Sequence, residues 1–338
     1  MSAVEPLVPG RRDAITDVRG VRVGHWTSRR RATGCTVILC EESTLGAVDV
    51  RGGAPATHET DVLSGENAIR RCHSVVLTGG SAFGLAATAG VARWLAGRGV
   101  GVETNAGPVP IVVGAAIYDL PTGRNAFPGA DEGERAASRA AGGRVAQGSV
   151  GAGTGTTVAK LLGVEQELKG GLGTASLVGP RGLVVGALAV TNSVGAIVDP
   201  ETGELVAGPR GKSCGDMRTP EQAVVERVGG TDSFRANTTL VCVATNADIE
   251  HLGVQRLAVH GHDGLARSIV PAHTLGDGDT VFALTTGKVA TEPHDLTTLG
   301  LMAMLTVERA VVRSVELAEG LAGVPSAQEW REGSDKRG

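Results

Sequence analysis

Short apolar runs recur along the chain, separated by glycine-rich turns and by longer segments with helical spacing of apolar residues. Most of these runs do not alternate with polar residues, which is typical of strands that are buried on both faces. The expected strands are Thr36–Leu39, Ser74–Leu77, Pro110–Leu120, Leu183–Thr191, Thr239–Thr245 and Thr280–Thr285. A sheet that is covered on both faces needs further layers around it, so the sequence predicts a compact, layered α/β fold.

Helical segments alternate with these strands. The expected helices are Phe83–Ala96, Asp131–Ala141, Pro220–Val228, Ile249–Ile269 and Leu296–Leu321. We expect an interruption of the fourth helix at His260-Gly261-His262-Asp263-Gly264, and fraying after Ser326. The longest uncharged stretch, Gly182 to Val198, is too short and too polar for a membrane span and predicts two buried strands around a turn.

The composition narrows the class of protein. Charged residues make up 20% and hydrophobic residues 41% of the chain, a balance that is typical of globular proteins. The net charge of −4 and the aromatic content of 2% supply neither a basic surface nor the rings on which bases stack. We therefore expect no nucleic-acid partner and no membrane partner, and we expect residues 1–338 to form a single domain.

The cysteines and histidines bear on compartment and metal binding. The chain has five cysteines and no C-x-x-C motif: Cys35, Cys40, Cys72, Cys214 and Cys242. Together with an N-terminus that lacks the apolar core of a signal peptide, they predict reduced, mostly buried thiols in the cytoplasm. The grouped histidines lack a second pair at structural-zinc spacing, so we expect no metal: His251, His260, His262 and His273.

Two glycine-rich segments depart from the motifs they approach. Ser81 follows a strand and a Gly-Gly pair, but Phe83 stands where the G-x-S-x-G nucleophile elbow has its last glycine. This segment is either a tight turn before a helix or part of a substrate pocket. The stretch 151–160 lacks the Gly-Lys-Ser/Thr of a P-loop, and Lys160 taken alone is typical of a surface lysine.

A threonine stands at the mouth of one expected strand. Thr238 follows Asn237 and directly precedes the run Thr239–Thr245. The preceding segment, Asp199 to Ala236, has scattered glycines and charges and predicts a long surface loop with one short helix. Such a loop can expose or strain a peptide bond, although a threonine in a strand is by itself ordinary.

Two aspartates flank a glycine just before another strand. Asp277 and Asp279 stand at i and i+2 ahead of Thr280. One interpretation is a solvated hairpin turn, because Asp and Gly are turn residues. The other is a pair of carboxylates that point to one side and titrate together.

Several segments together resemble one known family. They are Val48-Asp49-Val50-Arg51-Gly52-Gly53-Ala54, Gly79-Gly80-Ser81-Ala82-Phe83-Gly84, Gly114-Ala115-Ala116-Ile117-Tyr118-Asp119, Thr191-Asn192-Ser193-Val194-Gly195, Asn237-Thr238-Thr239, and His273-Thr274 followed by Asp277-Gly278-Asp279-Thr280-Val281-Phe282-Ala283. In this combination the chain resembles the self-processing DmpA-type aminopeptidases. Within them it resembles the threonine-nucleophile branch that includes the 6-aminohexanoate-oligomer (nylon-oligomer) hydrolase. The resemblance runs from about Val21 to about Leu321.

The resemblance implies a four-layer α/β/β/α sandwich, a small peptide or amide substrate, no cofactor, and a homotetramer of cleaved protomers. It implies cleavage between Asn237 and Thr238 into fragments 1–237 and 238–338, with Thr238 as the nucleophile. The other catalytic residues that it implies are Asn192 for the oxyanion, the acid pair Asp277 and Asp279, Tyr118, and Lys160. Many members carry Ser at the nucleophile and Ser-x-Glu at the acid pair, so their substrate preference does not transfer.

Cleavage would supply the base that an internal threonine lacks. The new α-amino group of Thr238 would have an unperturbed pKa of about 7.7–8.0, so a useful fraction is neutral near pH 7 and can take the hydroxyl proton. No Ser-His-Asp set is then needed. Three alternatives stay open: an ω-amino-acid oligomer hydrolase, an acyltransferase like ornithine acetyltransferase, which normally has an Ala-Thr-Met-Leu context, and a scaffold without activity.

Overall fold

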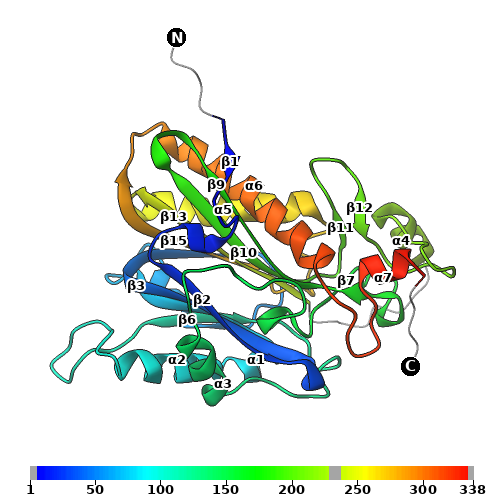
Figure 1. The fold of residues 1–338 in the computed structure, drawn as a ribbon, viewed down its shortest axis with the longest axis horizontal. Helices are drawn as coiled ribbons and strands as arrows, with labels where there is room; N and C mark the ends of the chain where they lie inside the picture. The colour runs from blue at the N-terminus through cyan, green and yellow to red at the C-terminus, as the bar shows by residue number, and fades with distance from the viewer. Residues whose placement is uncertain (1–5, 228–236, 334–338) are drawn as a thin grey trace, which may run out of the picture.

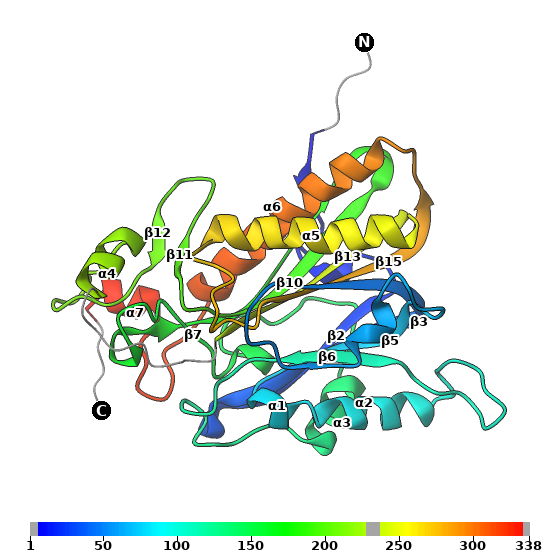
Figure 2. The same cartoon turned by 180° about the vertical axis from the view of Figure 1, so that it is seen from behind.

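The computed structural model describes residues 6–227 and 237–333. Helices lie on the two outer sides of the molecule and strands lie between them, as Figures 1 and 2 show. The helices are α1 (Ser81–Gly84), α2 (Ala87–Ala96), α3 (Ala130–Ser138), α4 (Pro220–Arg227), α5 (His251–Ser268), α6 (Asp295–Glu316) and α7 (Ala327–Arg331). Short 3-10 turns lie at Ile15–Asp17, Arg29–Arg31, Thr60–Leu63, Gly151–Gly153, Val164–Gln166 and Pro180–Gly182.

One 10-stranded sheet has the order β1-β9-β10-β13-β15-β3-β5-β6-β4, with β2 paired to β3. Its strands are β1 (Val8–Pro9), β2 (Val21–Ser28), β3 (Thr33–Val50), β4 (Thr57–His58), β5 (Arg71–Thr78), β6 (Val112–Ala116), β9 (Gly171–Val178), β10 (Val184–Asn192), β13 (Thr238–Asp248) and β15 (Thr280–Ala290). Two small sheets consist of β11 (Ala196–Val198), β12 (Leu205–Ala207) and β14 (Ile269–Val270), and of β7 (Thr157–Val158) and β8 (Leu168–Lys169).

The long strand β3 joins two layers of this sheet. Its first part, Cys35–Leu39, pairs with β5, whereas Leu45–Val50 pairs with β15. The layer with β9, β10, β13 and β15 therefore lies over the layer with β2, β5 and β6, as Figure 1 shows. Helices α5 and α6 cover the first layer, and α2 and α3 cover the second.

Three hydrophobic clusters separate the layers, which gives the expected four-layer α/β/β/α arrangement. Side chains alternate between clusters along each strand, as the two-residue period of a strand requires. On β13, Val241 and Val243 face α5 and α6, whereas Leu240 and Cys242 face the second sheet layer. Because both faces of β13 are covered, an uninterrupted apolar run forms a strand there.

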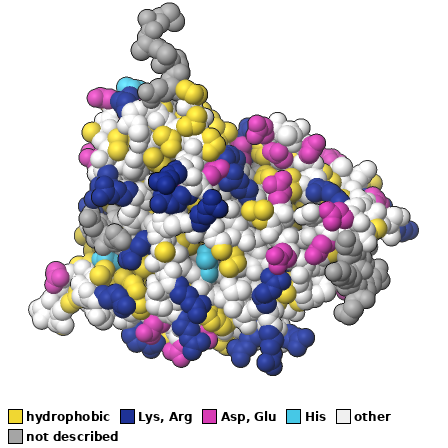
Figure 3. Space-filling view, in the orientation of Figure 1, with side chains coloured by type: hydrophobic (Ala, Val, Ile, Leu, Met, Phe, Trp, Pro, Cys, Tyr) yellow, Lys and Arg dark blue, Asp and Glu magenta, His cyan; other side chains and the backbone are white. Residues whose placement is uncertain are grey.

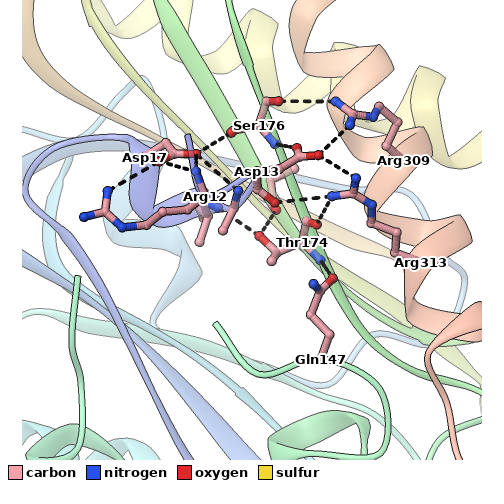
Figure 4. Close-up of polar contacts among 11 residues, drawn as sticks. Arg12, Asp13, Asp17, Gln147, Thr174, Ser176, Arg309 and Arg313 are labelled. Atoms are coloured by element: carbon pink, nitrogen blue, oxygen red, sulfur yellow. Dashed lines mark hydrogen bonds and ion pairs between the residues drawn. The ribbon is translucent and has the colours of Figure 1, made fainter. Parts of the chain in front are cut away.

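A polar cluster ties the N-terminal segment to α6 and β9 (Figure 4). The Asp13 carboxylate accepts hydrogen bonds from Arg309 at 2.6 Å, from the Ser176 amide at 2.9 Å, and from Arg313. Asp17 accepts from the Ser176 hydroxyl at 2.7 Å. The segment before β2 is thus held by charge-assisted hydrogen bonds, which are stronger than neutral ones.

Two of the sequence-based predictions on helices are wrong. Helix α5 runs without a break through Gly261 and Gly264. These two glycines are needed for close packing, because they let α5 approach β15 and α6. A Cβ on Gly261 would lie 2.7 Å from a Val281 methyl group, and one on Gly264 would lie 2.5 Å from the Met304 carbonyl. Residues 327–333 are also ordered: Ser326 caps α7, and Trp330 is buried, whereas residues 334–338 lie outside the described residues.

Other predicted boundaries differ by shorter stretches. The helix expected over 83–96 is divided into α1 and α2, and the strand expected over 110–120 is only Val112–Ala116. The stretch 182–198 does hold two strands, β10 and β11. Residues 228–236 lie outside the described residues. They include Val228, the expected end of α4, and the last part of the loop expected over 199–236.

The surface carries mixed charge. Figure 3 shows basic side chains over the centre and lower edge of one face and acidic side chains toward the side of β11 and β12.

The five cysteines are free and mostly buried, as predicted; Cys214 is the exposed one. Within residues 6–227 and 237–333, no helix is both long and apolar enough to cross a membrane.

Candidate active site

The residues expected to catalyse meet where β10 ends and β13 begins. Asn192, the last residue of β10, is the direct antiparallel partner of Thr238, the first residue of β13. Asn237 forms a parallel bridge with Asp277 just before β15. Thr238 is 3% exposed and Asn192 is fully buried, so the groups lie in a desolvated environment where electrostatic interactions are strong.

The carbonyl group between Asn237 and Thr238 is held by two donors. The Thr238 hydroxyl donates to the Asn237 carbonyl oxygen, and the Gly278 backbone N–H donates to the same oxygen at 2.7 Å. The Asn237 N–H donates to the Gly276 carbonyl at 2.7 Å, which fixes the other side of the residue. The Thr238 hydroxyl therefore contacts the carbonyl group that it would attack, and the Gly278 N–H already donates to the carbonyl oxygen.

Residue 278 has to be glycine for this approach. A Cβ there would lie 2.7 Å from Thr238 Oγ1 and 2.8 Å from the Ala54 carbonyl oxygen. Real side chains do not tolerate contacts that short. The close approach of the backbone at Gly278 therefore accounts for the glycine between the two aspartates.

Lys160 connects the side chains of both asparagines. Its ammonium donates to Asn237 Oδ1 at 2.7 Å and to Asn192 Oδ1 at 2.9 Å. The Thr157 N–H donates to the same Asn192 oxygen at 2.9 Å, so that oxygen accepts from two groups. The Asn192 amide nitrogen is left as the donor, and it donates to the Tyr118 carbonyl at 3.2 Å.

Asp279 is held on both carboxylate oxygens. One oxygen accepts from the Thr239 N–H at 2.7 Å, and the other from the backbone N–H and the Nδ1 of His273, at 2.9 and 2.8 Å. These three hydrogen bonds hold the Asp279 side chain between the start of β13 and His273.

Asp277 is held differently. One of its oxygens accepts from the Thr274 N–H at 2.9 Å and from the Thr274 hydroxyl at 2.6 Å. Burial, and next the charge of Asp279, raise the pKa of Asp277 above its usual value of 3.8. Both aspartates are buried, so the interpretation of a solvated hairpin turn is wrong.

Tyr118 reaches this cluster through its backbone. Its carbonyl oxygen accepts the Asn192 amide, and its side chain is half-buried. The hydroxyl role that the resemblance implies for Tyr118 stays a prediction. Lys160 is buried, so the interpretation as an ordinary surface lysine is wrong.

Ser81 and the grouped histidines make hydrogen bonds within the fold. The Ser81 N–H donates to the Ile117 carbonyl at 2.8 Å, and Ser81 has φ of 53° in the tight turn that begins α1. The four grouped histidines each make a hydrogen bond to a different residue: His251 to Leu63, His260 to Asp263, His262 to Asp49 and His273 to Asp279. In the described part of the chain, no group of three or more His, Cys, Asp or Glu side chains is placed to hold a metal.

Sequence reasoning missed a second buried lysine beside the site. Lys169 is completely buried, and its ammonium donates to the Thr154 carbonyl at 3.0 Å and to the Thr156 carbonyl. Burial lowers the pKa of Lys169 to about 7, although Asp119 and Glu167 act in the opposite direction. The only signal in the sequence is a lone charge beside Gly170 and an uncharged run.

With this geometry described, similarity to known proteins decides the family. The profile of peptidase family S58 matches residues 13–328. The chain belongs to peptidase family S58. This is the DmpA family, so the resemblance seen in the sequence is confirmed, and the chain is a hydrolase of peptide or amide bonds.

Individual S58 relatives cover most of the chain. An uncharacterized aminopeptidase of Mycobacterium tuberculosis (strain ATCC 25618 / H37Rv) is 42% identical over 350 residues, which is 95% of this chain and 99% of the relative. A 6-aminohexanoate-oligomer endohydrolase of Paenarthrobacter ureafaciens is 32% identical over 278 residues, which is 81% of this chain and 75% of the relative.

A solved structure shows the same fold. The L-aminopeptidase D-Ala-esterase/amidase of Ochrobactrum anthropi, a variant of the Ntn-hydrolase fold, matches with a TM-score of 0.72 at 24% identity. The match covers 94% of this chain and 90% of that chain. The expected fold class is therefore confirmed for this S58 member.

Proposed function

We propose that this S58 hydrolase cuts itself between Asn237 and Thr238 and then uses Thr238 as an N-terminal nucleophile on short peptides or amino-acid amides. The observation that carries the proposal is the double contact on the Asn237 carbonyl oxygen. The Thr238 hydroxyl and the Gly278 N–H at 2.7 Å both donate to it. A nucleophile and an oxyanion donor therefore meet on one peptide bond.

The first reaction is an acyl shift within the chain. The Thr238 oxygen bonds to the Asn237 carbonyl carbon and its proton passes to a base, so the carbonyl oxygen becomes an oxyanion on the Gly278 N–H. The C–N bond then breaks, the nitrogen takes a proton, and an ester remains. Water hydrolyses this ester to give the Asn237 carboxylate and a Thr238 with a free hydroxyl and amine. Removing one such donor typically costs about 10²–10³ in rate.

The acid pair has two different roles in this proposal. Asp279 accepts hydrogen bonds from Thr239 and His273 and fixes the start of β13. Asp277, whose pKa is raised by burial and by the charge of Asp279, exchanges the proton.

The second reaction uses the amine that the first one creates. The neutral α-amine of Thr238 takes the proton of its own hydroxyl during attack on a substrate carbonyl. The Asn192 amide nitrogen donates to the developing oxyanion, while Lys160 holds the opposite end of that amide. A Tyr118 hydroxyl that donates to the substrate and a homotetramer of cut protomers remain predictions from the resemblance. The cytoplasmic location remains a prediction from the cysteines and the N-terminal sequence.

The relatives suggest two classes of substrate. Aminopeptidase activity is favoured by the similarity to the mycobacterial proteins, which cover nearly the whole chain at 42% identity. Hydrolysis of ω-amino-acid oligomers is the second candidate, because the 6-aminohexanoate-oligomer endohydrolases are 32% identical. Turnover of aminoacyl p-nitroanilides, compared with that of 6-aminohexanoate oligomers, separates the two. The family match favours both over an acyltransferase or an inactive scaffold.

The test of self-cleavage is a comparison of the wild-type chain with Thr238→Ala and Thr238→Ser. The wild type should give two fragments, the smaller beginning at Thr238. Thr238→Ala should stay a single inactive chain, whereas Thr238→Ser keeps a hydroxyl and should still be cut. N-terminal sequencing that places the cut elsewhere, or cleavage that persists in Thr238→Ala, would refute the proposal.

A further inference from the structure

A hydrogen-bond path links the buried Lys169 to the site through one peptide group. The Lys169 ammonium donates to the Thr156 carbonyl oxygen. The N–H of the same peptide group, on Thr157, donates to Asn192 Oδ1 at 2.9 Å. Because a carbonyl that accepts from a cation polarises its own N–H, the two bonds strengthen each other.

The path ends on the oxygen that Lys160 also contacts. Lys160 donates directly to Asn192 Oδ1 at 2.9 Å, and Lys169 acts on the same oxygen from one peptide group away. Lys160, and Lys169 in its charged form, pull electron density toward Oδ1 of the amide. The N–H bonds on the other end of that amide become better donors as a result.

The position of Lys169 is fixed on every side. It belongs to β8, where it pairs with Thr157 of β7, and its side chain has no exposed surface. Its ammonium donates to two neutral carbonyl oxygens, on Thr154 and Thr156. An ammonium removed from water is costly unless it is paired, so a lysine here requires an explanation beyond packing.

The neighbouring charges are also defined. The buried acids Asp119 and Glu167 raise the pKa of Lys169, whereas Lys160 and Arg29 lower it. Asp119 accepts from the Gly80 N–H at 2.6 Å and directly follows Tyr118, whose carbonyl accepts the Asn192 amide nitrogen. The oxygen of the Asn192 amide therefore accepts from Lys160, and its nitrogen donates to the residue before Asp119.

We infer that Lys169 is a positioning residue that acts on Asn192 through the Thr156–Thr157 peptide group, and so sets the orientation and donor strength of the amide that meets the oxyanion. This inference rests on the proposed function. It assigns to the reaction a residue that touches neither the nucleophile nor the cut peptide bond.

A double-mutant cycle tests this path. Lys169→Met has a similar volume but no donor and no charge. In the chain with Asn192, it should lower kcat on the order of tenfold, as loss of an outer partner of a catalytic group does, with KM nearly unchanged. In the Asn192→Ala chain, which is itself slower by about 10²–10³, the same substitution should change the rate by less than about twofold.

A purely structural lysine predicts a different result. Its loss would lower the rate by the same factor with and without the Asn192 amide, because the effects would be independent. Equal factors in the two backgrounds would overturn the inference, and so would a wild-type rate in Lys169→Met. Turnover of an aminoacyl p-nitroanilide is measured on chains that have been cut completely, and Lys288→Met, an exposed lysine on β15, is the matched control.

Two further comparisons keep the test decisive. If Lys169→Met does not fold, the cycle is run with Lys169→Gln, whose neutral amide can still donate to carbonyl groups; the same background dependence is expected. A wild-type chain that is neither cut at Asn237–Thr238 nor active on amides refutes the proposed function. A wild-type chain that is cut, with a cycle that is additive, refutes only the role of Lys169.

Discussion

Asn192 lies directly opposite Thr238 in the antiparallel pairing of β10 with β13. Both side chains are buried, and Lys160 joins the Asn192 oxygen to the side chain of Asn237. The groups that would stabilise an oxyanion and the group that would attack are therefore fixed by backbone pairing rather than by a flexible loop. Sites built on strands hold their geometry more closely than sites on loops.

The acid pair should be needed for chemistry and not for the turn. Asp277→Asn and Asp279→Asn should fold but cleave slowly, because the first removes the carboxylate proposed to exchange the proton and the second removes the carboxylate that holds the start of β13. A carboxylate beside an amine stabilises the charged amine, so its loss lowers the pKa of the amine. In any cut mutant, the limb of the pH–rate profile that reports the amine should shift toward acid. Normal processing and turnover in both mutants would contradict this.

Gly278→Ala should block the first reaction. The added methyl group would lie 2.7 Å from Thr238 Oγ1, so the hydroxyl or the Gly278 N–H has to move. Displacement of about 1 Å can cost about 10²-fold in rate, and we expect a loss of at least that size. The matched control is Gly143→Ala, where a Cβ meets nothing within 4 Å. Cleavage at the wild-type rate in Gly278→Ala would exclude this arrangement of donors.

Lys160→Met should slow cleavage without unfolding the chain. It removes a charged donor from both Asn192 Oδ1 and Asn237 Oδ1. Hydrogen bonds to charged groups contribute about 1.5–3 kcal/mol, which corresponds to a loss of about 10-fold to 100-fold in rate. The exposed Lys288→Met should behave as the wild type in the same gel assay of cleavage. A Lys160→Met chain as fast as that control would remove Lys160 from the mechanism.

Asp13 should stabilise the fold at neutral pH and not in acid. Burial acts to raise its pKa, but the hydrogen bonds from Arg313 and Ser176 and the charge of Arg309 outweigh burial and lower it below 3.8. Since the pKa is lower in the folded state, this stabilisation is complete above about pH 4 and is lost as the pH falls through the folded-state value.

Urea unfolding measures this contribution. Asp13→Asn should lower the free energy of unfolding at pH 7 by about 2 kcal/mol, and the difference from wild type should shrink as the pH falls below about 4. Asp131→Asn is the matched control, because the ion pair of Asp131 with Arg93 is exposed and should change stability by less than about 0.5 kcal/mol. A difference that is equal at pH 7 and in acid would contradict the prediction.

The sequence predicts the position of strands that are buried on both faces. The strands around Thr238 and Thr280 were predicted because their apolar runs are unbroken. Strand β9 was missed because its glycines weaken the strand pattern. A Cβ on Gly173 would lie 2.0 Å from the Ala310 carbonyl oxygen, so this glycine allows β9 and α6 to approach closely. That requirement comes from a helix far along the chain, and no local pattern shows it.

The candidate site likewise has residues that the sequence predicts and residues that it does not. Thr238, Asn192 and the acid pair lie at the ends of apolar runs, so their order along the chain was enough to suggest them. Lys169 acts through the carbonyl of Thr156, and the Gly278 donor is a backbone N–H. A residue type does not show which partner its backbone N–H or carbonyl group takes, so sequence reasoning did not find these two contacts.

The place of β13 determines what a cut would leave behind. Its new N-terminus would lie inside the sheet, between β10 from the first fragment and β15 from the second, and β15 in turn pairs with β3 of the first. The two pieces would stay interleaved, yet either one, once separated, would lack its neighbouring strands. Such a protein would fold as one chain and work as two, so its first reaction would replace the unimolecular route to refolding with one that requires two molecules to meet.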